Sequence, residues 1–111
     1  MTDPRSRLDA LRAETLGRIA TLRAELDDVI GSASSTTGDD EHDPEGATIG
    51  FERAQAQALL DAAQTQLVAI EAALARVDAG TYGVCVVCGR PIGEERLQAR
   101  PAADRCIACA S

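Results

Sequence analysis

Apolar residues recur at helical spacing through the first third of the chain. From residue 4 to about residue 30 the steps between them are threes, fours and one five, and the positions are Leu8, Leu11, Leu16, Ile19, Leu22, Leu26, Val29 and Ile30. That spacing forms one stripe on a helix. Asp3 and Pro4 supply a capping acceptor and a first-turn proline, while Gly31 can take the left-handed conformation that ends a helix. The pattern predicts a helix from residue 4 to about residue 30.

A second stripe has the alternating steps of four and three that are typical of a coiled coil. Its positions are Ala56, Leu60, Ala63, Leu67, Ile70, Leu74 and Val77. This helix opens at Asp43 and Pro44 and ends before Gly80. Two consecutive long helices with one stripe each bury those stripes against each other, and antiparallel packing is the simple arrangement. The predicted fold is mainly α, with a long antiparallel helical hairpin over residues 1–79.

The connection between the two helices, "GSASSTTGDDEHD", is 13 residues long. Loops between antiparallel helices usually need about 2 to 8 residues. At 1.5 Å per residue the second helix would run roughly 50 Å, so the connection lies far from the chain's two ends. We therefore expect an acidic tip loop, residues 31–47, at the far end of the hairpin.

The acidity of the chain is concentrated in this loop. The net charge is −7, and −2 would remain without five acids, which are Asp39, Asp40, Glu41, Asp43 and Glu45. Asp43 is placed to cap the second helix, and acids near a helix start are stabilising. Capping needs one or two carboxylates, whereas five repel one another, so the cluster indicates a function beyond stability. His42 has no second histidine with which to form a site and is interpreted as a solvated loop residue.

Four cysteines stand near the end of the chain as two C-x2-C pairs in "CVVCGRPIGEERLQARPAADRCIAC". The spacing is typical of a four-thiolate zinc site without an open coordination position, which is a structural rather than a catalytic arrangement. The predicted ligands of one Zn²⁺ are Cys85, Cys88, Cys106 and Cys109. Gly89 permits the first turn, and about 30 residues need the metal in order to fold. Iron in the same cage and a thiol–disulfide switch remain alternatives.

Composition narrows the class of protein. The chain has no run of 18 apolar residues and no secretory signal, so we expect a cytoplasmic protein with no membrane partner. Arginines and acids between the cysteine pairs nearly balance, so no specific DNA binding is expected. The sequence shows no nucleophile with a plausible base and no phosphate-binding glycine loop, which argues against an enzyme.

The segment "TYGVCVVCGRPIGEERLQARPAADRCIAC" resembles the zinc finger of the DksA/TraR family of bacterial transcription regulators, and the hairpin before it fits the same architecture. The resemblance covers residues 43–109, with a finger module at 80–111. It implies a hairpin that enters the secondary channel of RNA polymerase, with acidic tip residues approaching the active site. Members of this family change the lifetime of promoter complexes without binding DNA specifically, often together with ppGpp.

Counted back from the cysteines without gaps, the family's tip motif Asp-x-Ala falls on Glu45, Gly46 and Ala47. Glutamate stands where the family has aspartate, and the Asp-Pro pair at 43–44 is displaced by one position. The resemblance therefore implies that Asp43, Glu45 and Ala47 act at the polymerase. Basic positions that help long members to bind ppGpp fall on Ala62, Thr65 and Ala69, so a ppGpp response of the same kind is doubtful.

The predicted function is a non-enzymatic regulator of transcription that binds RNA polymerase, with a structural zinc finger. One alternative is a Gre-like channel factor, whose tip carboxylates would position Mg²⁺ so that the polymerase cleaves its transcript. Another is a zinc- or thiol-sensing adaptor that does not act on polymerase.

Overall fold

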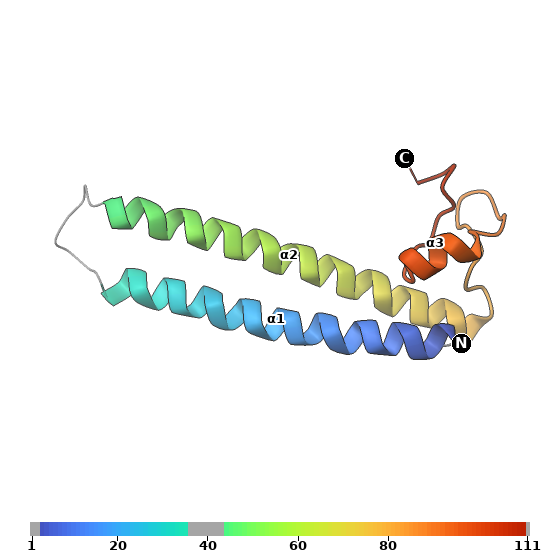
Figure 1. The fold of residues 1–111 in the computed structure, drawn as a ribbon, viewed down its shortest axis with the longest axis horizontal. Helices are drawn as coiled ribbons and strands as arrows, with labels where there is room; N and C mark the ends of the chain where they lie inside the picture. Colours follow the sequence, from blue (N-terminus) through green and yellow to red (C-terminus); the bar gives the residue numbers. More distant parts are fainter. Residues whose placement is uncertain (1–2, 36–43, 111) are drawn as a thin grey trace. The chain divides into compact units, whose positions relative to one another are not determined.

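The computed structural model describes residues 3–35 and 44–110, with side chains at all of these except 29–35 and 44–47. Three helices lie in this part of the chain: α1 is Pro4–Ser35, α2 is Pro44–Ala79 and α3 is Glu94–Ala99. The described residues form no strand, only one isolated bridge between Val84 and Pro91. Figure 1 shows α1 and α2 side by side. The predicted mainly α fold, a helical hairpin followed by a four-cysteine module, is confirmed.

The start of α1 is capped as its sequence predicts. The backbone N–H of Ser6 donates to Asp3 Oδ1 at 2.7 Å. This hydrogen bond, with a further one from the Ser6 side chain, lowers the pKa of Asp3. The predicted end of this helix was wrong, because α1 continues through Gly31 to Ser35. A glycine inside a helix costs only about 1 kcal/mol relative to alanine, and no proline stands in the next residues to block the turn.

Two ion pairs report the antiparallel register of α1 and α2. Arg5 pairs with Asp78, and Arg12 Nη2 lies 3.5 Å from Glu71 Oε2. A step of seven residues along α1 is thus matched by a step of seven residues back along α2. All four side chains are at least two-fifths exposed, and such pairs contribute about 0 to 1 kcal/mol each. The apolar stripes, rather than these charges, hold the helices together.

The chain divides into two compact units, Leu16–Thr65 and a second that combines Met1–Thr15 with Gln66–Ser111. Each unit contains part of α1 and part of α2. The predicted division into a hairpin at 1–79 and a finger at 80–111 stays a prediction.

The unit that contains the finger has a fully buried core of Leu8, Ile70 and Ala73. Partly buried hydrophobic residues pack against it from the helices and from the finger, namely Leu11, Leu74, Val77, Tyr82 and Ala102. The finger thus shares one core with the first residues of α1 and the last turns of α2. In the other unit the buried side chains are those of Ile19, Leu22, Ala56, Leu60 and Ala63, all positions of the predicted stripes.

One position of the first stripe was wrong. Leu16 is 39% exposed, whereas Thr15 is 1% exposed and takes the place expected for Leu16. The step of five from Leu11 to Leu16 overshoots the buried face, while steps of four through Thr15 to Ile19 stay on it. The Thr15 hydroxyl donates to the carbonyl oxygen of Leu11 at 2.8 Å, so its polar group is satisfied inside the core.

This difference predicts that alanine substitutions at two leucines of α1, both in the unit Leu16–Thr65, lower the stability by unequal amounts. Leu16→Ala is expected to lower the free energy of unfolding by less than about 1 kcal/mol, because the side chain is already partly in water. Leu22→Ala is expected to lower it by about 2 to 5 kcal/mol, because a cavity replaces a buried side chain. Urea unfolding followed by circular dichroism measures both. Equal losses would show that the register of α1 is not the one described.

Residues Thr48–Ala79 of α2 are long and apolar enough, by length and composition alone, to cross a membrane. Their best 18-residue stretch has a mean hydropathy of 1.2, and 22% of it is buried. Core helices of soluble proteins meet the same criteria, and α2 buries Ala56, Leu60 and Ala63. The expectation of no membrane partner therefore stays a prediction.

Candidate metal centre

The end of α2 turns the chain into the finger. Gly80 takes the left-handed conformation, with φ of 76°, and its N–H donates to the carbonyl of Val77 at 3.2 Å. The N–H groups of Thr81 and Tyr82 both donate to the carbonyl of Arg76, at 2.9 and 3.2 Å. These bonds satisfy carbonyls that a helix end leaves free. The predicted helix end before Gly80 is confirmed.

The first cysteine pair lies on a tight backbone turn. The N–H of Cys85 donates to the carbonyl of Arg90 at 2.8 Å, and the N–H of Gly89 donates to the carbonyl of Cys85 at 3.0 Å. Gly89 has φ of +75°, a conformation that side chains other than glycine rarely adopt. The turn at Gly89 that the sequence predicts is therefore present.

The second pair lies on a turn of its own, in which the N–H of Cys109 donates to the carbonyl of Cys106 at 3.0 Å. The N–H of Val86 donates to the carbonyl of Asp104 at 2.9 Å and ties the second segment to the first. The helix α3 separates the two pairs and was not predicted. The Nε of Arg96, on α3, donates to the carbonyl of Arg105 at 2.8 Å and holds α3 beside the second pair.

The four sulfur atoms all lie within 4.8 Å of one another, and those of Cys88 and Cys106 are 3.7 Å apart. Four sulfurs that each lie about 2.3 Å from one tetrahedral zinc ion are about 3.8 Å from one another. The separations therefore fit one zinc ion. No disulfide joins the four cysteines, and Cys85 is buried while Cys88 is exposed.

Backbone N–H groups prepare one of these thiols to become a thiolate. The N–H groups of Cys88, Cys106 and Val87 donate toward the sulfur of Cys85 and lower the pKa of its thiol to about 6, although burial raises it. Hydrogen bonding with the Cys106 thiol, together with burial, raises the pKa of Cys109 to about 12. A metal that takes all four as thiolates must displace the remaining protons, so its affinity increases with pH.

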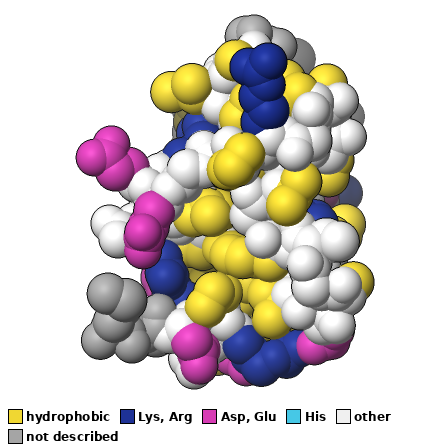
Figure 2. Space-filling view, turned by 90° about the vertical axis from the view of Figure 1, so that its right-hand side faces the viewer, with side chains coloured by type: hydrophobic (Ala, Val, Ile, Leu, Met, Phe, Trp, Pro, Cys, Tyr) yellow, Lys and Arg dark blue, Asp and Glu magenta, His cyan; other side chains and the backbone are white. Residues whose placement is uncertain are grey.

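Apolar side chains between the ligands are turned outward. Val86, Val87 and Ile107 are 57%, 61% and 80% exposed. Figure 2, which views the side of the molecule that carries the finger, shows hydrophobic side chains at the surface among basic and acidic ones. Of the finger's described hydrophobic residues only Cys85 and Ile92 are buried. The finger therefore lacks an apolar core large enough to hold its two turns together without a metal.

The predicted tip residues lie mostly outside the part of the chain that the structure describes. Asp43 lies outside the described residues, as do the other acids of 39–41 and His42. Glu45 and Ala47 belong to the first turn of α2, but their side chains are outside those described. The tip site stays a prediction.

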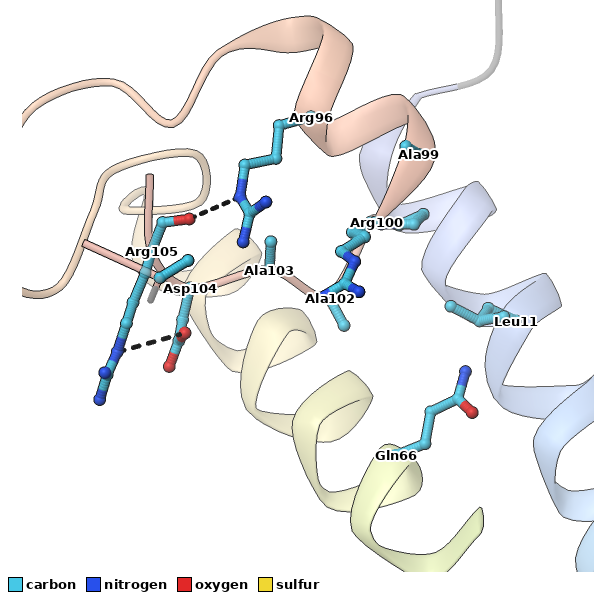
Figure 3. A pocket seen from close by; sticks show the side chains of 11 residues that line it. Leu11, Gln66, Arg96, Ala99, Arg100, Ala102, Ala103, Asp104 and Arg105 are labelled. Atoms are coloured by element: carbon cyan, nitrogen blue, oxygen red, sulfur yellow. Dashed lines mark hydrogen bonds and ion pairs between the residues drawn. The ribbon is translucent and has the colours of Figure 1, made fainter. Parts of the chain in front are cut away.

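The structure also brings together arginines that sequence reasoning interpreted only as a balance of charge. A cavity of about 600 Å³ is lined by Leu11 of α1, Gln66 of α2, and α3 with the segment that follows it (Figure 3). Arg96, Arg100 and Arg105 contribute to its wall. The sequence places Arg96 and Arg100 close together in "RLQARP", but it gives no sign of the opposite wall, which comes from residues far away in the chain.

Comparison with known proteins places these features in a family. The family model described as prokaryotic dksA/traR C4-type zinc finger matches residues 80–111. The RNA polymerase-binding transcription factor DksA of Haemophilus influenzae is 52% identical over 40 residues, which are 36% of this chain and 28% of that protein. DksA of Escherichia coli K12 is 50% identical over 40 residues, 36% of this chain and 26% of that protein. The match thus spans little more than a quarter of these relatives.

A solved structure extends the similarity to most of the chain. Transcription factor DksA2 from Pseudomonas aeruginosa is 32% identical, with a TM-score of 0.54, and the match covers 93% of this chain and 79% of that one. The C4-type finger and the cluster of four thiols together show one structural zinc ion. With its helical hairpin, its four clustered thiols and a similarity that extends over nine-tenths of its length, the chain belongs to the DksA/TraR family of C4-type zinc-finger proteins.

Proposed function

We propose that this protein is a cytoplasmic transcription regulator that binds RNA polymerase and enters its secondary channel with the helical hairpin. The observation that carries the proposal is the similarity to transcription factor DksA2 over 93% of the chain. The names of the relatives matched by the finger, RNA polymerase-binding transcription factors, support the same partner.

In this proposal the zinc ion has a structural role and the protein is not an enzyme. Cys85, Cys88, Cys106 and Cys109 ligate the metal, which leaves no position for a substrate. The ion holds two turns that expose their apolar side chains, so it replaces the core that the finger lacks.

Asp43, Glu45 and Ala47 act at the polymerase active site. The start of α2 at Pro44 supports this assignment, because it puts Asp43 immediately before the helix and Glu45 in its first turn. Acids at the start of a helix are in general favoured by the positive end of its dipole.

The double variant Asp43→Ala/Glu45→Ala tests this role. We expect it to bind core polymerase as the wild type does, because the rest of the hairpin and the finger are unchanged, and to lose most of the effect on transcription initiation. A pull-down of core polymerase and an in-vitro transcription assay measure the two properties.

Asp39→Ala/Asp40→Ala is the matched control, since it removes the same charge from nearby positions of the acidic stretch and should act like the wild type. A wild-type protein that neither binds core polymerase nor changes initiation would overturn the proposal. Shortened RNA from backtracked complexes would instead identify a cleavage factor.

The in-vitro transcription assay also tests the response to ppGpp, and a gel-shift assay without polymerase tests binding to promoter DNA. Ala62, Thr65 and Ala69 are exposed and uncharged, so we expect the effect on initiation to be the same with and without ppGpp. Promoter DNA without polymerase should not be bound specifically, because Arg96 donates to a carbonyl of the finger itself and Arg105 lies 3.9 Å from Asp104.

A further inference from the structure

A short segment of the finger, Arg100–Asp104, touches both the metal centre and the helices of its unit. Ala102 packs against the buried core of Leu8, Ile70 and Ala73. The carbonyl of Asp104, two residues before Cys106, accepts the N–H of Val86, which stands between two zinc ligands. We call residues 100–104 the bridging segment.

Two side chains hold the bridging segment against the end of α2. The hydroxyl of Tyr82 donates to the carbonyl of Pro101 at 2.7 Å, and Arg76 Nη2 donates to the carbonyl of Ala103 at 3.5 Å. A tyrosine hydroxyl is protonated at neutral pH, and burial raises the pKa of Tyr82 further, so this group acts as a donor. Tyr82 also packs against the core formed by Leu8, Ile70 and Ala73.

The Arg76 contact is the weaker of the two. Its hydrogen bond is long, and its buried Nε has no hydrogen-bond partner among the described groups. A buried donor without a partner is unfavourable, which offsets part of what the hydrogen bond of Arg76 contributes. The connection between finger and helices therefore depends mainly on Tyr82 and on the core.

We propose that the bridging segment couples zinc binding to the packing of α1 against α2 in this unit, so that a substitution in α1 that touches no cysteine accelerates the loss of zinc. The finger has too small a core to stay ordered alone, and the surface that completes this core is Leu8 with Ile70 and Ala73. Weakening that surface populates an open finger from which zinc escapes. Because linkage is reciprocal, zinc in turn stabilises the first turns of α1.

Zinc release to a colorimetric chelator measures the coupling. Leu8→Ala is expected to accelerate release about tenfold or more, because a fully buried side chain is truncated. Tyr82→Phe removes only the hydroxyl and is expected to accelerate release about three- to tenfold. The second variant keeps the test valid if the first one fails to fold.

Ile19→Ala is the matched control, since it truncates a buried side chain of the same helix in the other unit. It should leave the release rate within about twofold of the wild type. Unchanged release in Leu8→Ala and Tyr82→Phe would overturn the coupling. Equal acceleration by Ile19→Ala would also overturn it, because zinc would then leave through unfolding of the whole chain.

Hydrogen exchange tests the reverse direction. Removal of zinc with EDTA should reduce the protection of amides at residues 8–15 of α1 more than at residues 19–28. Equal loss of protection in both stretches would contradict a coupling confined to this unit. Neither measurement involves polymerase, so failure of the coupling is distinguishable from failure of the proposed function.

Discussion

Cys85→Ser is expected to abolish stoichiometric zinc binding and to unfold the finger. Structural zinc sites contribute an apparent free energy of about 10 to 16 kcal/mol in zinc-finger peptides, and a hydroxyl cannot replace a thiolate ligand. Within the finger itself little apolar surface can compensate, because Cys85 and Ile92 are its only described hydrophobic residues that are buried. The zinc content after gel filtration and a ¹H–¹⁵N correlation spectrum measure the two effects.

Val87→Ser is the matched control for this variant. Val87 stands two residues from Cys85 in the same turn, its side chain is 61% exposed, and it is not a ligand. The Val87→Ser variant should bind one zinc ion, and the backbone amide signals of its finger should stay dispersed in the ¹H–¹⁵N spectrum. If Cys85→Ser retained zinc with native-like signals, the four-thiolate assignment would be wrong.

Ile70→Ala is expected to lower the free energy of unfolding by about 2 to 5 kcal/mol. The side chain is fully buried beside Leu8 and Ala73, where α1, α2 and the finger meet, so its loss leaves a cavity that three elements would have to close. Small domains have a total stability of about 5 to 15 kcal/mol, so this single change removes a large part of it. Urea unfolding followed by circular dichroism at 222 nm measures the loss.

Val68→Ala is the control for Ile70→Ala, because it truncates an apolar side chain of the same helix that is exposed rather than buried. Val68 stands two residues before Ile70 and is 67% exposed. Its truncation should change the stability by no more than about 0.5 kcal/mol. A loss at Val68 as large as that at Ile70 would mean that α2 buries a different face.

Features with a local physical cause were predictable from the sequence. Pro4, Pro44 and Gly80 mark helix boundaries because proline fixes φ and glycine accepts a positive φ, and the structure has α1 and α2 begin or end there. The cysteine cluster was predictable for a similar reason. A tetrahedral site built from two tight turns takes two ligands from each turn, and the C-x2-C spacing supplies those two ligands.

Features that depend on tertiary contacts were not predictable. Thr15 is buried and Leu16 is not, because the position of the opposing helix selects one of two neighbouring faces. The hydrogen bonds of Tyr82 to Pro101 and of Arg76 to Ala103 end on backbone carbonyls, which every residue carries. The sequence therefore contains no sign of these partners. The short helix α3 buries no residue and so leaves no apolar periodicity to detect.

The sharing of one core by Leu8 and Ile70 has a consequence for the order of folding. Contacts between residues far apart in the chain form late, because the intervening chain must first lose the entropy of a closed loop. Within Leu16–Thr65 the two helices meet across shorter stretches of chain, so forming their contacts costs less loop-closure entropy than bringing Leu8 to Ile70. Leu8 and Ile70 are more than 60 residues apart in the sequence, so we expect their shared core to form after the contacts within Leu16–Thr65.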